Sequence, residues 1–97
     1  MIEKTGDRLQ VTVPMVIANA SALLEAGRRF LQPGRSAGEV VFDFSAVAEA
    51  DSSALTLVVA WLRSARESGA TLRVINPPSG MLTLAELYGV LDFLPFA

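Results

Sequence analysis

The chain has 97 residues, the length of one domain, and its 8 Lys and Arg against 10 Asp and Glu give a net charge of −2. It contains no cysteine and no histidine, which excludes disulfides and thiolate chemistry and removes the commonest general base and metal ligand. The basic residues are too few and too scattered for a nucleic-acid partner. We expect no metal and no cofactor. The hydrophobic share of 52% is high for a single domain and indicates a lasting partner surface.

Membrane segments are not expected. No apolar run approaches the roughly 20 residues that a bilayer-spanning helix needs. The first residues, Met-Ile-Glu-Lys-Thr-Gly-Asp-Arg, lack the pattern of a signal peptide. We therefore expect a cytoplasmic protein without direct membrane insertion, held beside the inner membrane only through a partner.

The first third of the chain predicts two strands and a helix. Residues 2–5 form a short strand, Gly6-Asp7 a hairpin turn, and the alternation of residues 8–13 a half-buried strand that Pro14 ends. Asn19 is expected to cap a helix over residues 20–32. Its inward stripe would contain Leu23, Gly27, Phe30 and Leu31.

The rest of the chain alternates strands and helices. Residues 39–44 predict a central strand, Asp51 caps a helix to about residue 68, and residues 71–75 predict a further strand. Ser79 is expected to cap a third helix that ends before Gly89, and residues 90–96 fit either a strand or a helical turn. Strands separated by helices imply crossover connections, so we expect one α/β domain over residues 1–97 with a mixed, mostly parallel sheet.

The segment Asp51-Ser52-Ser53 opens the second helix with a carboxylate and two hydroxyls. On one interpretation Asp51 is only the N-cap and the serines are ordinary first-turn residues. On the other, Ser52 is a contact or regulatory hydroxyl, at a helix end that favours a phosphate or another anionic group. Asp43, at the end of the central strand, is expected to be structural, accepting hydrogen bonds from loop N–H groups or from the region of Ser52.

The second helix is apolar on two sides. Leu55, Val58, Val59, Leu62 and Ala65 form a stripe expected to face the sheet, whereas Ala54, Leu57 and Trp61 lie on another side. Trp61 is the only tryptophan of the chain. Either Trp61 packs against the third helix as part of the core, or Ala54, Leu57 and Trp61 form a docking patch beside Ser52.

Two stretches resemble a known family. Val41-Phe42-Asp43-Phe44-Ser45, followed by Ala50-Asp51-Ser52-Ser53-Ala54-Leu55, is similar to the signature of STAS domains (sulfate transporter and anti-sigma factor antagonist). The resemblance implies a small α/β domain with helices packed on one face of a mixed sheet. In the antagonist members the hydroxyl at the position of Ser52 is phosphorylated by an anti-sigma factor kinase.

A narrower resemblance lies at the C-terminal end. The segment Leu-Thr-Leu-Ala-Glu-Leu-Tyr-Gly-Val over residues 82–90, with Leu94-Pro95, is similar to the end of MlaB-type STAS subunits. These subunits bind the ATPase of an ABC transporter that moves phospholipids for outer-membrane lipid asymmetry. Two positions depart from the STAS pattern: Ala54 replaces a glycine, and Val13-Pro14-Met15-Val16 stands where the family has a glycine-containing turn.

The resemblance leaves two functions open. The first is a non-catalytic subunit that binds an ABC transporter ATPase, and through it a membrane permease, and supports their assembly and activity. The alternative is an anti-sigma factor antagonist switched by phosphorylation of Ser52. Ala54 and the apolar composition favour the first. An enzyme is not expected, because no base is placed to activate Ser52 and there is no glycine-rich phosphate loop.

Overall fold

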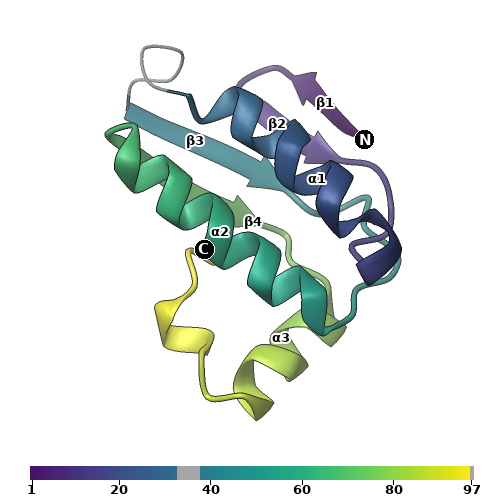
Figure 1. Cartoon of the computed structure of the whole chain (residues 1–97). Helices are drawn as coiled ribbons and strands as arrows, with labels where there is room; N and C mark the ends of the chain where they lie inside the picture. The colour runs from purple at the N-terminus through teal and green to yellow at the C-terminus, as the bar shows by residue number, and fades with distance from the viewer. Residues whose placement is uncertain (33–37, 97) are drawn as a thin grey trace.

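The computed structural model describes residues 1–32 and 38–96. These residues form a four-stranded sheet, three α-helices and one 3-10 helix, η1. In chain order the elements are β1 (Ile2–Thr5), β2 (Arg8–Val11), α1 (Ile17–Phe30), β3 (Gly38–Asp43), α2 (Ser52–Glu67), β4 (Ala70–Ile75), α3 (Ser79–Leu87) and η1 (Leu91–Phe93). The predicted element order is confirmed (Figure 1).

The sheet has the strand order β1-β2-β3-β4. β1 and β2 form an antiparallel hairpin, and Gly6 takes the positive φ of 62° that its turn requires. β3 pairs in parallel with β2 on one side and β4 on the other. The prediction of a mixed, mostly parallel sheet is therefore confirmed.

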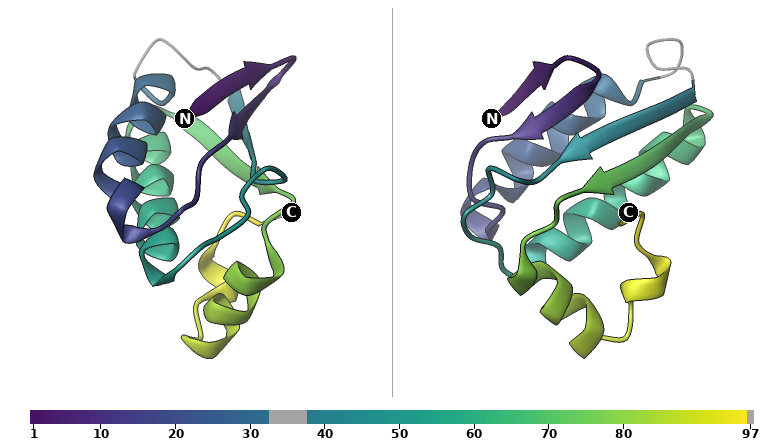
Figure 2. Two further views of the ribbon diagram at one scale, coloured as in Figure 1. Left: turned by 90° about the vertical axis from the view of Figure 1, so that its right-hand side faces the viewer. Right: turned by 180° about the vertical axis from the view of Figure 1, so that it is seen from behind.

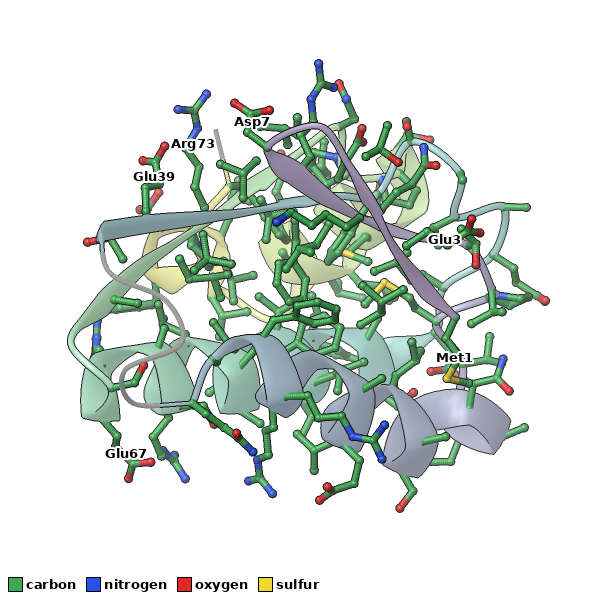
Figure 3. The ribbon with its side chains drawn as sticks, turned by 90° about the horizontal axis from the view of Figure 1, so that it is seen from above. Met1, Glu3, Asp7, Glu39, Glu67 and Arg73 are labelled. Carbon is green, nitrogen blue, oxygen red and sulfur yellow. The ribbon has the colours of Figure 1, made fainter. Side chains whose placement is uncertain are left out.

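Two of the helices, α1 and α2, pack on one face of the sheet, the arrangement that the family resemblance implied. Figure 2 shows α1 and α2 stacked against the same side, with α3 and η1 beyond the end of β4. On the opposite side of the sheet the side chains of Glu39 and Arg73 form an ion pair at 3.4 Å, and Figure 3 shows both pointing away from the helical layer. No helix of the described ranges 1–32 and 38–96 covers that face.

Trp61 lies at the centre of the core. Its side chain is fully buried, and its ring centroid lies 4.6 Å from that of Phe42 on β3. The indole N–H donates to the carbonyl oxygen of Leu24 on α1 at 3.3 Å. Gly27, also on α1, lets the two helices approach, because a β-carbon there would lie 2.2 Å from the indole nitrogen. Trp61 thus joins α1, α2 and the sheet.

Some element boundaries differ from the sequence prediction. α1 begins at Ile17 rather than after Asn19, whose side-chain amide instead donates to the carbonyl oxygen of Pro14. Pro78, not Ser79, is the N-cap of α3. β2 ends at Val11, two residues earlier than expected.

The C-terminal tail combines both of the structures that its sequence allowed. A short 3-10 turn, η1, is followed by a single parallel bridge between Phe96 and Val74. The N–H of Val74 donates to the carbonyl oxygen of Pro95 at 2.8 Å. The tail therefore pairs with the outer edge of β4 at Val74.

Candidate functional site

The start of α2 is built around the carboxylate of Asp51. This residue is the N-cap, as predicted, and its Oδ1 accepts from the backbone N–H of Ser53 at 2.9 Å and from the Ser53 hydroxyl. Its Oδ2 accepts from the backbone N–H of Ile17 at 3.0 Å. One carboxylate therefore satisfies free N–H groups at the start of both α2 and α1.

Backbone hydrogen bonds hold the same corner. Met15 and Ala50 form an isolated parallel bridge, in which the Met15 N–H donates to Glu49 and the Asp51 N–H donates to Met15. Together with the Asp51 bonds, they fix the segment before α1 against the segment before α2. The hydrogen bonds from the Ser53 hydroxyl and the Ile17 N–H hold the pKa of Asp51 below its usual value.

Ser52 and Ser53 have different surroundings although they are adjacent. The hydroxyl of Ser53 is directed to Asp51, whereas Ser52 is exposed and its hydroxyl makes no hydrogen bond within the described ranges. Ser52 is thus the accessible hydroxyl of the pair, and Ser53 has a structural role in the cap.

Asp43 connects β3 to β2 and to the residue that follows β4. It is 5% exposed and lies at the end of β3. Its Oδ1 accepts from the Ser45 N–H at 2.9 Å and the Asn76 amide at 3.1 Å, and its Oδ2 from the Arg8 guanidinium at 3.3 Å. The predicted bond from a loop N–H is present, but the partners come from β2 and the end of β4 and not from the Ser52 region.

Two opposing effects act on the pKa of Asp43. Burial raises it, because a charged carboxylate loses hydration. The hydrogen bonds from Ser45, Asn76 and Arg8 favour the charged form and together hold the pKa below its usual value. Asp43 is therefore an ionised structural group that joins the end of β3 to Arg8 at the start of β2 and to Asn76 after β4.

The predicted docking patch of Ala54, Leu57 and Trp61 is wrong. Ala54 and Trp61 are fully buried and Leu57 is 5% exposed. The sequence showed that this side of α2 needs a partner, but the partner is α1 within the same chain. The expectation that Trp61 packs on α3 is also wrong, because its ring lies between α1 and the sheet. Ala54 and Trp61 support the site from the core, and Leu57 reaches the surface only at a hollow between α1 and α2.

A different apolar surface surrounds Ser52. An open groove of about 680 Å³ lies where the start of α1, the first turns of α2 and the end of α3 meet. We call it the Ser52 groove; its lining residues are Ile17, Ser52, Ser53, Leu55, Thr56, Val59, Tyr88 and Val90. A second hollow of about 390 Å³ between α1 and α2 shares Ile17, Ser53 and Thr56 with it.

The large apolar side chains of the Ser52 groove are unusually exposed. Ile17 is 74%, Tyr88 55% and Val59 40% exposed. Val59 was expected to face the sheet, and the structure corrects this: Val58 is the fully buried member of the pair. Ile17 gave no sequence signal, whereas Tyr88 belongs to the C-terminal segment that resembled MlaB-type subunits. Neighbouring apolar side chains exposed around one hydroxyl are typical of a protein-binding surface.

Comparison with known proteins identifies the family. The family model described as "Mlab, STAS domain" matches residues 2–95. The chain belongs to the STAS domain family, in its MlaB-type branch. STAS domains of this kind are regulatory or accessory modules rather than catalysts. The second stretch that suggested the family, residues 50–55, contains Asp51 and Ser52 at the start of α2.

The solved structures support the fold of this STAS domain. One of them, a proposed anti-sigma factor antagonist from Thermotoga maritima, is similar with a TM-score of 0.75 and 19% sequence identity. The similarity covers 99% of this chain and 83% of that one. No curated protein sequence matches the chain.

No group of three or more carboxylates within residues 1–32 and 38–96 is arranged to hold a metal ion. In the same part of the chain no helix is both long and apolar enough to cross a membrane.

Proposed function

We propose that this STAS domain is a non-catalytic subunit that binds the ATPase of an ABC transporter for phospholipids and supports its assembly and activity. The membership of the MlaB-type family supports this proposal. The observation that carries it is the Ser52 groove, in which exposed Ile17, Val59 and Tyr88 surround an accessible hydroxyl. A permanent partner would cover this apolar surface. Binding to that partner would hold the STAS domain in the cytoplasm, beside the inner membrane.

Affinity capture from the native cells tests the proposal. The tagged wild-type chain should recover an ABC ATPase together with its permease, identified by mass spectrometry. Val59→Asp, which places a charge inside the groove, should lose the ATPase because the buried charge would lack a partner. Thr71→Asp, on an exposed position of β4, is the matched control and should retain it. Recovery of the ATPase by Val59→Asp would show that the groove is not the contact.

The alternative function is a phosphorylation-switched anti-sigma factor antagonist. The exposed Ser52 hydroxyl favours it, because a kinase needs an accessible acceptor. A phosphate there would add a charge of about −1.5 to −2. Phosphorylated Ser52 in chain isolated from cells, together with capture of an anti-sigma factor kinase, would replace the transporter proposal. Stable capture of the ATPase by Ser52→Ala would reject the switch.

A further inference from the structure

The Ser52 groove has charges of only one sign along the segments that build it. Residues 9–27, 36–62 and 74–97 contain no Lys or Arg, and every residue that lines the groove lies in these ranges. Four carboxylates lie within three residues, along the chain, of a lining residue: Glu49, Asp51, Glu86 and Asp92. Glu49, Glu86 and Asp92 are exposed.

These carboxylates are not neutralised by ion pairs. Within residues 1–32 and 38–96 the ion pairs join Arg8 to Asp43, Arg28 to Glu25, and Arg73 to Glu39. None of the four carboxylates at the groove takes part. Along α2 the first cation beyond the groove is Arg63, one helical turn after Val59. Within the described residues, the segments that line the apolar groove therefore carry carboxylates outside any ion pair, and the nearest cation along them is Arg63.

We propose that the Ser52 groove takes an apolar segment of the partner that is flanked by lysine or arginine side chains. This inference rests on the proposed function for the identity of the partner and adds the chemistry of its docking segment. Apolar contact with Ile17, Val59 and Tyr88 would supply the affinity. Attraction to the carboxylates would fix the orientation of the segment and speed the encounter.

Charge argues against the other occupants of this surface. A second copy of the chain, bound by a twofold axis through the groove, would bring the same carboxylates face to face. An anionic lipid headgroup or a free phosphate would find no cation among the residues that line the groove, and the positive end of the α2 dipole is already compensated by Asp51. The anionic group that Ser52 suggested from the sequence is thus disfavoured relative to a cationic one.

Two synthetic peptides test this directly. Both are about 18 residues long, enough for roughly five helical turns, and share one Leu-rich face; the polar face is Lys in one and Glu in the other. Binding of each fluorescently labelled peptide to the full chain is followed by anisotropy. The Lys peptide should bind about tenfold or more tightly at about 0.05 M salt, and the difference should shrink at about 0.5 M, where the Debye length is only a few ångströms.

Matched charge variants locate the effect. Glu86→Lys with Asp92→Lys should remove most of the preference for the Lys peptide. The control, Glu3→Lys with Glu67→Lys, makes the same change of charge at exposed positions of β1 and of the last turn of α2, outside the segments that line the groove, and should preserve it. Equal binding of the two peptides, tighter binding of the Glu peptide, or an equal effect of both double variants would overturn the inference.

The peptide experiment and the affinity capture can fail independently of each other. Capture of the ATPase without any preference for the Lys peptide would overturn this inference alone. A Lys preference that depends on Glu86 and Asp92, without capture of an ATPase, would remove the proposed function and keep the cationic segment. A chain that sediments as a dimer, and as a monomer after Val59→Asp, would assign the groove to a second copy and also overturn the inference.

Discussion

Gly27 is the residue on which the contact between α1 and α2 depends. A β-carbon at this position would lie 2.2 Å from the Trp61 indole nitrogen and 2.3 Å from the adjoining ring carbon. The ring cannot retreat, because it is fully buried against Phe42. Any side chain here must therefore displace the helix or the ring.

Gly27→Ala should lower the free energy of unfolding by about 1–3 kcal/mol, the usual cost of overpacking a core. Gly80→Ala is the matched control, because Gly80 also lies in a helix but has open space at its β-carbon position. That variant should be neutral or stabilising, since alanine is the better helix former. Thermal and urea unfolding would check both. A stable Gly27→Ala would mean that the two helices are not in the contact described.

Asp43 gives the fold a dependence on acid. Its folded-state pKa is held below the usual value, so the folded chain binds fewer protons than the unfolded chain in that range. The stabilisation by Asp43 is therefore complete above the usual Asp pKa, near pH 4, and is lost as the pH falls through the folded-state pKa.

Asp43→Asn should be less stable than wild type at pH 7 by about 1.5–3 kcal/mol, the worth of a hydrogen bond to a charged group. The difference between the two should narrow as the pH falls below about 4. Urea unfolding from pH 7 to pH 3 measures this. Glu3→Gln, which also removes one negative charge but at an exposed position, should show no such convergence.

For single residues, the sequence predicted the structural role of a side chain better than its burial. Asp51 as a cap and Asp43 as a structural acceptor both followed from their places at the ends of elements. The burial of Trp61 could not be predicted in the same way. A helical wheel shows that α2 has two apolar sides, but it does not show which neighbouring element covers each side. Only the tertiary arrangement places α1 over one side and leaves Val59 facing solvent.

At the scale of elements, α1 and α2 begin as a pair. Asp51 accepts hydrogen bonds from the first turn of its own helix and from Ile17 at the start of the other. The sequence prediction placed the start of α1 later, after Asn19, because a side-chain cap is expected next to the first residue of a helix. The acceptor that α1 uses lies 34 residues away, a distance that no local pattern can show.

Asp51→Ala should loosen the starts of both helices. The amide protons of Ser53 and Ile17 should exchange faster with solvent, because each loses its carboxylate acceptor. Hydrogen exchange followed by NMR would measure the two sites together. Ser52→Ala, a change in the same turn that removes no bond of the cap, should leave both rates unchanged. Faster exchange at Ser53 alone would mean that Asp51 caps only its own helix.

At the scale of the whole molecule, the fold could be predicted and the binding surface only in part. The alternation of strands and helices restricts the topology strongly, since crossover connections of parallel strands have one hand. No comparable rule restricts which residues form the Ser52 groove. It combines Ile17, residues 52–59 and Tyr88, and the sequence marked only the Ser52 corner and, through resemblance, the segment that contains Tyr88.

The discontinuous origin of the Ser52 groove links binding to folding. Its lining comes from three separate parts of the chain, so the unfolded chain has no counterpart of it. A partner that binds only the native state adds stability by mass action, about 2.7 kcal/mol at a free concentration 100 times its Kd. For the proposed subunit, the copies left without an ATPase would unfold most often and be degraded first. The supply of partner would thereby set the abundance of this chain in the cell.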